Sequence, residues 1–306
     1  MRTLIFTVLL LAAYSPASAC DACGCSIGGN YFGILPQFHR HFVGIRWAEQ
    51  SFQSAHSVGA AEAGRYATQE RFRTVDLLAR FYPSRRVQVL AVLPFHHFQR
   101  QEGSTLTHAR GLGDAVLLGN YIVLNTGDSL GRHWQHSLTL GGGLKLPTGP
   151  HQLRDGQGTA LLANMQPGSG STDVLLSAAY TLRRGAWGFN ADALGRLNTA
   201  NAQGYRFGHR LSASAKFFYW TRWGKRLTLL PNAGVFADAA QRNRSGGEQV
   251  EATGGYLVLG TGGLDVYAGR FSVGFTYQQP LHQQLGQGQI RASQRWMTTL
   301  NYLFGG

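Results

Sequence analysis

Residues 290–304 read IRASQRWMTTLNYLF, a stretch in which apolar and polar side chains alternate. The even-numbered apolar positions are Ile290, Ala292, Trp296, Leu300, Tyr302 and Phe304, and the odd-numbered polar positions are Arg291, Ser293, Arg295, Thr299 and Asn301. Because successive side chains of a β-strand point to opposite faces, this alternation predicts a strand with one apolar and one polar face. The stretch exceeds the ~5–6 residues of an ordinary soluble strand and satisfies the ~9–11 that a tilted membrane-crossing strand needs.

The same period of two recurs along most of the chain. Residues 210–219 (RLSASAKFFY) and 271–278 (FSVGFTYQ) show it clearly. Such segments begin near residues 41, 70, 85, 111, 135, 171, 186, 206, 225, 256, 270 and 290. We therefore predict an all-β chain, a transmembrane antiparallel up-and-down β-barrel of about 12 strands over residues 41–304.

The connections between these segments alternate in length. Short turns are predicted at residues 83–85, 183–185, 221–224 and 268–269, with a somewhat longer one at 125–133. Longer loops are predicted at residues 51–69, 99–110, 147–170, 198–205, 239–255 and 282–289. Outer-membrane barrels have short periplasmic turns and longer extracellular loops, so we expect both chain ends of the barrel on the periplasmic side.

Charged residues fall on the polar face of the predicted strands. An Arg or Lys that faces lipid at mid-depth costs ~2–4 kcal/mol, so the alternation assigns these residues to the lumen. The predicted lumen-lining residues are Arg46, Asp76, Arg80, Asp114, Lys145, Asp173, Asp192, Arg196, Arg206, Arg210, Lys216, Asp238, Asp265, Arg291 and Arg295. Two interpretations stay open: a selective pore lined by charge, or opposite charges that pair and fill a narrow lumen.

The first residues have the layout of a secretory signal peptide. Arg2 precedes an apolar run over residues 4–13, and Ala17-Ser18-Ala19 is a small-residue cleavage site. The apolar run is too short for a membrane-spanning helix, which needs roughly 20 residues. We predict a cleaved signal peptide at 1–19, a periplasmic segment at 20–40 and localisation in the outer membrane of a Gram-negative bacterium.

The three cysteines of the chain, Cys20, Cys23 and Cys25, lie together at the predicted mature N-terminus. Three thiolates suit Cu(I) or Zn, and His39 is a further candidate ligand. Other roles compete with a copper or zinc site: acylation of Cys20 as in a lipoprotein, a disulfide between two of the three thiols, or no role.

The formal charge of +13 raises the question of an anionic partner. The arginines are spread out rather than clustered, and an exported chain rarely meets nucleic acid, so we expect no nucleic-acid partner. We expect contact with outer-membrane lipid and lipopolysaccharide and with a small solute or ion; the oligomeric state stays open. We also expect that the protein is not an enzyme. His209 falls on the lipid-facing side of its predicted strand, where a catalytic His would need a nucleophile beside it, and its outward neighbours, such as Phe207 and Leu211, offer none.

Three phrases resemble a known family. They are Gly111-Leu112-Gly113-Asp114, then residues 143–149 (GLKLPTG), then residues 168–173 (GSGSTD). Together they resemble the MetA-pathway phenol-degradation family of outer-membrane proteins. The head at residues 20–25 (CDACGC) with residues 33–38 (GILPQF) resembles a subgroup of this family from the Bacteroidota. The resemblance implies a barrel with a transport role and no defined substrate.

We therefore expect an outer-membrane channel or transporter that passes small solutes through a charged lumen. Two alternatives remain. One is a metal-linked outer-membrane protein that uses the N-terminal cysteines. The other is a lipid-anchored structural surface protein with a filled lumen.

Overall fold

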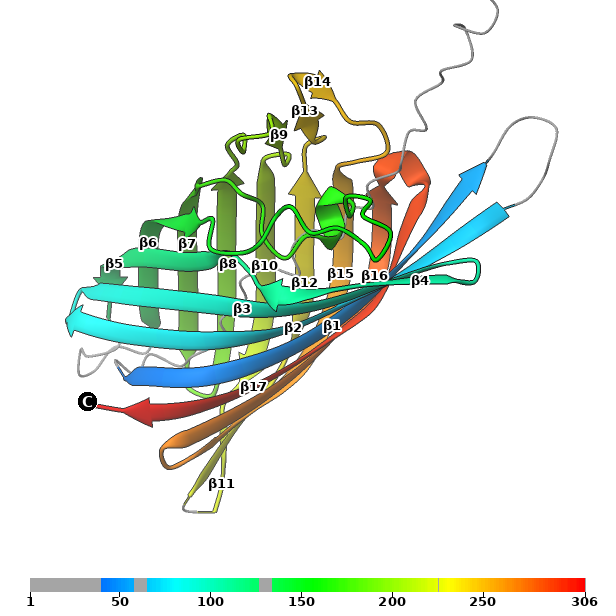
Figure 1. Ribbon diagram of the computed structural model, residues 1–306. Coiled ribbons are helices and arrows are strands. Elements are labelled where there is room, and N and C mark those ends of the chain that lie inside the picture. The colour runs from blue at the N-terminus through cyan, green and yellow to red at the C-terminus, as the bar shows by residue number, and fades with distance from the viewer. Residues whose placement is uncertain (1–39, 58–64, 127–133, 225, 306) are drawn as a thin grey trace, which may run out of the picture.

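The computed structural model describes residues 40–57, 65–126, 134–224 and 226–305. They form one twisted antiparallel barrel with an additional small sheet at one end (Figure 1). The wall strands are β1 (His41–Ser57), β2 (Arg65–Ser84), β3 (Val87–Glu102), β4 (Thr105–Leu112), β5 (Ala115–Asn125), β6 (Gln135–Leu146), β7 (Asp173–Arg184), β8 (Trp187–Leu197), β10 (Arg210–Tyr219), β11 (Thr221–Trp223), β12 (Leu227–Ala240), β15 (Gly255–Ala268), β16 (Phe271–Leu285) and β17 (Ile290–Phe304).

The barrel closes because each wall strand pairs with its sequence neighbour and β1 pairs with β17. Strands β4 and β5 are two halves of one wall strand, since both pair with β3 on either side of a break at Gly113 and Asp114. Strand β11 is a short extension that pairs with β12 beside β10. The result is a closed antiparallel barrel of 12 strands, which confirms the predicted fold class.

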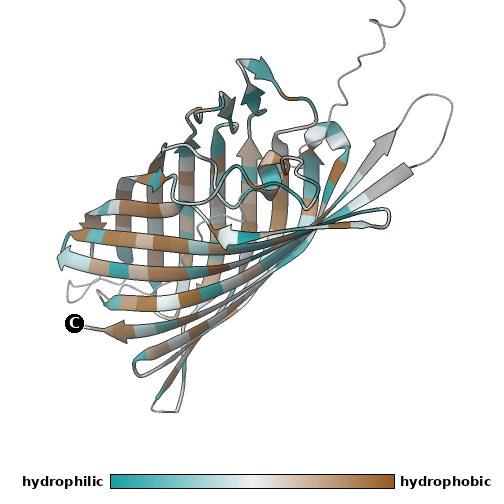
Figure 2. Ribbon diagram, in the orientation of Figure 1, coloured by the Kyte–Doolittle hydropathy of each residue, from teal (hydrophilic) through white to brown (hydrophobic). Residues whose placement is uncertain are grey.

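Apolar bands alternate with polar ones along the wall strands (Figure 2), and the outer surface of the wall is apolar because its outward positions are mostly large exposed hydrophobic residues. Ile45 pairs with Leu300 on one side and Leu77 on the other, and all three side chains are exposed on the outside. The row above contains Trp47, which aligns with Phe95 across β2. An apolar belt next to an aromatic row is the lipid-facing surface of an outer-membrane barrel. The chain is accordingly an outer-membrane protein.

The two ends of the barrel differ. At one end the connections are tight, as at Gly185 and Gly269, whose positive φ angles of 59° let the chain reverse in two-residue turns. At the other end lie the long connections, including a small sheet of β9 (Tyr205–Arg206), β13 (Arg244–Ser245) and β14 (Glu248–Gln249). Loop length identifies this second end as extracellular. Two short 3-10 turns, η1 (Ala163–Met165) and η2 (Gly286–Gly288), also lie here, and no helix of the described chain is long and apolar enough to cross a membrane.

A β-bulge in β17 changes the orientation of one predicted lumen residue. Gln50 of β1 pairs with Arg295, but Phe52 pairs with Ala292, so one extra residue of β17 is inserted between them. A bulge exchanges the faces of all residues beyond it. Ile290 and Ala292 are therefore buried inside the barrel and Arg291 is exposed on the outside, so the assignment of Arg291 to the lumen was wrong.

Two stretches predicted as loops are largely strand. Strands β3 and β4 continue to a tight turn at residues 103–104, so residues 99–110 form a hairpin rather than a loop. Strands β1 and β2 likewise extend far into the predicted loop at 51–69. This wall projects beyond the rest of the barrel at the extracellular end (Figure 1).

Replacing Leu300 with Arg places a charge in the apolar belt, and replacing Leu106 with Arg is the matched control on the projecting hairpin. Leu300 is 50% exposed and Leu106 is 55% exposed, so the two sites differ in surroundings rather than in packing. We expect Leu300→Arg to make folding into bilayers less favourable by ~2–4 kcal/mol and Leu106→Arg to change the free energy of folding little. Urea titration of protein refolded into lipid vesicles measures both values. Equal changes in folding free energy for the two variants would contradict the assignment of Leu300 to the lipid-facing belt.

Candidate functional site

The inside of the barrel is layered. Along β1 the inward side chains pass from Phe42 through Arg46 to Phe52. Along β2 they pass in the same direction from Leu78 through Asp76 to Phe72. A charged layer therefore lies between two apolar layers. The lower apolar layer comprises Phe42, Leu78, Leu90, Val92, Val116, Leu118, Leu175, Leu194, Phe218, Leu230, Tyr267 and Leu303.

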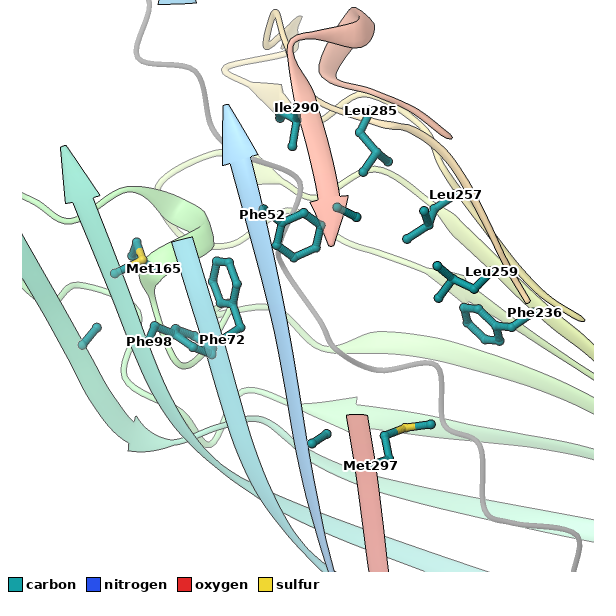
Figure 3. Packing of buried hydrophobic residues seen from close by; sticks show 13 residues of the cluster. Phe52, Phe72, Phe98, Met165, Phe236, Leu257, Leu259, Leu285, Ile290 and Met297 are labelled. Atoms are coloured by element: carbon teal, nitrogen blue, oxygen red, sulfur yellow. The ribbon is translucent and has the colours of Figure 1, made fainter. Parts of the chain in front are cut away.

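The upper apolar layer lies toward the extracellular loops. Phe72 contacts Phe52 and Phe98 edge-on, with ring centroids 5.7 Å and 4.9 Å apart. Figure 3 shows that Met165, from η1, lies beside these rings although it belongs to a loop. The other members are Ala48, Ala109, Phe236, Leu257, Leu259, Leu285, Ile290, Ala292 and Met297. The connection between β6 and β7 thus folds into the barrel rather than out into solvent.

Lys145 is the centre of the charged layer. Its Nζ donates a hydrogen bond to Asp114 Oδ2 at 2.7 Å and lies 2.8 Å from Asp173 Oδ2. The side chains of Lys145, Asp114 and Asp173 are 7%, 7% and 1% exposed. Lys145 also contacts Ser169 Oγ and donates to the Ser171 carbonyl at 3.3 Å. A buried ammonium between two carboxylates is tolerated because several oxygens replace its water.

The Asp114 carboxylate also fixes both ends of the connection between β6 and β7. Its Oδ1 accepts from the Gly149 N–H at 3.1 Å, and its Oδ2 accepts from the Ser169 N–H at 2.9 Å. Gly168 lies so close to Gly149 that a Cβ at position 168 would meet the Gly149 backbone. The loop therefore enters and leaves the lumen at one point, and only glycine permits that approach.

Other inward charges are paired around the same level. Arg46 Nη2 lies 2.6 Å from Asp76 Oδ2, and Arg210 Nη2 lies 2.9 Å from Asp238 Oδ2. Arg295 Nε donates to Gln278 Oε1 at 2.5 Å. These contacts join neighbouring strands across the inner wall. Arg46 and Arg210 are compensated by carboxylates, whereas the partner of Arg295 is a neutral amide.

We call the connection between β6 and β7, residues 147–172, the inserted loop. A cavity of about 150 Å³ remains between the charged layer and this loop. It extends to Phe207, Asn243 and Gly254 at the extracellular loops. Its lining combines charged groups with apolar and aromatic ones. The lining includes Arg46, Asp76, Val92, Pro94, His96, Phe98, Asp114, Lys145, Asn164, Ser169, Asp173, Arg196, Phe207 and Arg210. The site can hold a small molecule that presents both an apolar part and a polar or charged group.

The predicted lumen residues occupy three kinds of place. Arg46, Asp76, Arg80, Asp114, Lys145, Asp173, Lys216 and Arg295 are buried in the barrel. Asp192, Arg196, Arg210, Asp238 and Asp265 are half-buried at inward positions of their strands. Arg206 belongs to β9 in the extracellular sheet and not to a wall strand, and Arg291 is exposed outside. The prediction for Arg206 was wrong because the chain joins the wall only at Arg210.

Sequence reasoning missed several inward residues at the extracellular end. Glu70 lies 3.6 Å from Arg100 and accepts from Asn164 Nδ2 at 3.3 Å. Glu70 and Arg100 fell in or beside predicted loops, so no parity was assigned to them. Asn164 comes from the inserted loop. Only the alternation continuing past residue 99 could have revealed the longer strands.

The predicted metal ligands Cys20, Cys23, Cys25 and His39 lie outside the described residues. Within the described chain no group of three or more His, Cys, Asp or Glu side chains is arranged to hold a metal. The copper or zinc site therefore stays a prediction.

The chain also contains two G-x-S-x-G sequences, at Gly24–Gly28 and Gly127–Gly131. This pattern marks a hydrolase nucleophile where it forms a sharp turn between a strand and a helix. Both sequences lie outside the described residues. The second falls in the connection between the barrel strands β5 and β6, so the element that follows it is a strand and not the helix that the motif requires.

Replacing Lys145 with Met removes the only described cation in contact with both Asp114 and Asp173. We expect the free energy of unfolding to fall by about 3–5 kcal/mol, because two buried carboxylates lose their counter-charge. Urea titration of the refolded barrel measures it. The triple variant Lys145→Met, Asp114→Asn, Asp173→Asn removes the uncompensated charges and should regain part of the loss. A single variant as stable as the native protein would contradict this account.

Comparison with solved structures finds the same fold. The chain superposes on an outer-membrane channel from Pseudomonas putida F1 with a TM-score of 0.63 and 16% identity, covering 89% of this chain and 100% of the other. The β domain of a Bordetella autotransporter gives a TM-score of 0.49 and 12% identity, covering 87% and 100%. No protein-family model matches the chain, and no curated protein matches it. At 16% identity the likeness to the Pseudomonas putida channel is one of fold: an outer-membrane β-barrel.

Proposed function

We propose that the barrel is an outer-membrane channel or transporter that passes small solutes through its charged lumen. The observation that carries the proposal is the cavity between the charged layer and the inserted loop. A structural barrel filled by ion pairs alone would need no such space. The fold shared with the Pseudomonas putida channel supports the same conclusion.

The lining of the cavity favours amphipathic solutes. Phe98, Phe207 and Val92 offer apolar surface, while Arg196 and Arg210 offer guanidinium groups. Around the cavity four basic side chains (Arg46, Lys145, Arg196, Arg210) face three acidic ones (Asp76, Asp114, Asp173), and Asp238 pairs with Arg210 beside it. Charged groups of both signs next to apolar surface suit solutes that combine a polar group with an apolar part. We propose small amphipathic organic solutes.

The inserted loop is the element that narrows this route. Gln166 Oε1 accepts a hydrogen bond from the Leu153 N–H at 2.9 Å, and Gln166 Nε2 donates one to the Leu153 carbonyl at 3.0 Å. The two ends of residues 154–165 therefore lie side by side, and a short linker can replace the stretch without disturbing the anchors at Asp114. The replacement would remove Met165 and Asn164 from the lumen.

Replacing residues 154–165 with a short Gly-Ser linker should raise the single-channel conductance roughly twofold or more, because the obstruction leaves the lumen. Planar-bilayer recording of the purified protein measures it. The matched control places the same linker at residues 245–248, which are exposed and line no part of the cavity, and should leave conductance unchanged. Ion conduction by neither the native protein nor the loop variant would favour the filled, structural barrel.

Family membership is a second part of the proposal. The three phrases that resemble the MetA-pathway phenol-degradation family converge on one contact: Asp114 ends the first, Lys145 lies in the second, and Ser169 and Asp173 belong to the third. A shared structural purpose explains why three short phrases occur in this order. This convergence supports the resemblance beyond its separate motifs.

The N-terminal region remains as proposed from the sequence: a signal peptide at 1–19 and a periplasmic segment at 20–40. For the metal-linked alternative we expect reduced protein to bind copper or zinc stoichiometrically. A variant with Cys20, Cys23 and Cys25 replaced by Ser should bind none, because the soft ligands are gone. Elemental analysis after dialysis measures both. Equal binding by the two proteins, or none by either, would remove this alternative.

A further inference from the structure

A band of polar side chains lies on the outside of the projecting wall, above the aromatic row. The row of Trp47, Val75, Phe95 and Leu112 is apolar across β1 to β4. The next outward row, two residues further along each strand, is Glu49, Arg73, His97 and Arg110. The following row is Ser51, Arg71, Gln99 and His108, and the last is Gln53, Gln69, Gln101 and Leu106, with Arg291 of β17 beside Gln53.

This position is at the level of lipid headgroups. Each row lies about 7 Å beyond the last along the strand, since a strand rises ~3.3–3.4 Å per residue. Trp47 and Phe95 are of the type that marks the membrane interface, so the polar rows begin where hydrocarbon ends. The loops place this end of the barrel outside the cell. The band therefore borders the outer leaflet.

The charge of the band is basic. Arg73 Nε lies 2.6 Å from Glu49 Oε2, which compensates one pair. Arg71, Arg110 and Arg291 are exposed, and no ion pair joins any of them to a carboxylate in the described chain. We name these three residues, with His97 and His108, the basic patch. The outward side chains around these arginines are mostly amides. The neighbouring carboxylates are already paired, Glu49 with Arg73 and Glu70 with Arg100, so the charge of the three arginines is not compensated by them.

Two hollows on the outer wall give the basic patch a shape. One of about 240 Å³ is lined by Arg71 with Gln53, Gln69, Gln99 and Gln101. The other, of about 350 Å³, is lined by His97, Gln99, His108 and Arg110. Gln99 borders both, so the hollows adjoin. Guanidinium, imidazole and amide donors around adjoining hollows match a phosphorylated sugar.

The opposite wall lacks this feature. The outward positions of β10 are Leu211, Ala213, Ala215, Phe217 and Tyr219, all of them apolar or aromatic. In the extracellular half of the described wall from β6 to β15, outward positions carry no Lys or Arg. A general preference for basic residues at the interface would be spread around the barrel. Confinement to one wall points to a specific partner on that side.

We propose that the basic patch binds the phosphorylated glucosamine headgroup of an outer-leaflet glycolipid, and so fixes one wall of the barrel against a bound lipid. Charge complementarity selects this occupant, since outer-leaflet phosphates lie at the height of the patch. Arg71 and Arg110 can each donate paired N–H groups to a phosphate. The inference is independent of what passes through the lumen.

The test compares lipid binding by native protein and by the double variant Arg71→Gln, Arg110→Gln. The matched control is Arg222→Gln, Arg226→Gln, which removes the same charge from exposed positions at the periplasmic end. The probe is diphosphorylated lipid A, titrated into detergent-solubilised protein and followed by native mass spectrometry. We expect the double variant to bind about tenfold more weakly, which is the effect of losing two charge-assisted hydrogen bonds in a partly hydrated site. The control variant should bind as tightly as the native protein.

A second measurement uses only the native protein, so it does not depend on folding of the variant. Dephosphorylated lipid A should bind about tenfold more weakly than the diphosphorylated form. Equal affinity for the two lipids, or equal affinity of native and double-variant protein for diphosphorylated lipid A, would overturn the proposal. A native oligomer that dissociates in the double variant, with lipid binding unchanged, would assign the patch to a second copy of the chain and would also overturn it.

Discussion

A bilayer core offers no hydrogen-bond partner to a charged side chain, and this constraint organises the whole molecule. It forces the charges of the spanning strands inward, and it forces the sheet to close so that no backbone edge faces lipid. The pairing of β1 with β17 meets the second demand. The first demand concentrates Arg46, Lys145 and Arg295 in a narrow interior, where they must find partners or become costly.

The interior meets that cost by pairing across strands. The register sets Lys145 directly opposite Asp173, and Asp114 lies on the other side at the break between β4 and β5. One lysine thereby bridges two carboxylates that would otherwise repel each other. Because Asp114 also binds two backbone N–H groups of the connection, the same contact that settles the charge holds the loop inside. Electrostatic compensation and the shape of the cavity are one arrangement.

The sequence predicted the wall well because lipid enforces alternation on one face. Asp76, Lys145 and Asp173 could be assigned to the interior by parity alone. Alternation does not predict the faces correctly beyond the bulge of β17. Ser293 and Gln294 are both polar, so the sequence does not show which of them is the extra residue. The faces of Arg291 and Ile290 were exchanged for that reason.

Contacts made by the loop were beyond prediction for a different cause. Nothing local in the sequence says that Met165 turns inward, because its position depends on the anchors at Gly149 and Ser169 and on the space between Phe72 and Phe98. The interior holds apolar residues at both ends, which the rule of a polar lumen would not predict. Phe52 and Phe72 point inward because the inserted loop covers them.

The projecting wall shows the same constraint from the outside. Where β1 to β4 leave the hydrocarbon, outward positions no longer have to be apolar. In β3 beyond Phe98, polar residues then lie on both faces, with Gln99 and Gln101 outward and Arg100 and Glu102 on the other face. That is why residues 99–110 read as a loop although they form a hairpin. The outward side chains there do not contact lipid tails, so binding to a partner can determine which residues occupy these positions. A strand that keeps its pairing while losing its apolar face marks both the upper limit of the membrane and the surface at which recognition becomes possible.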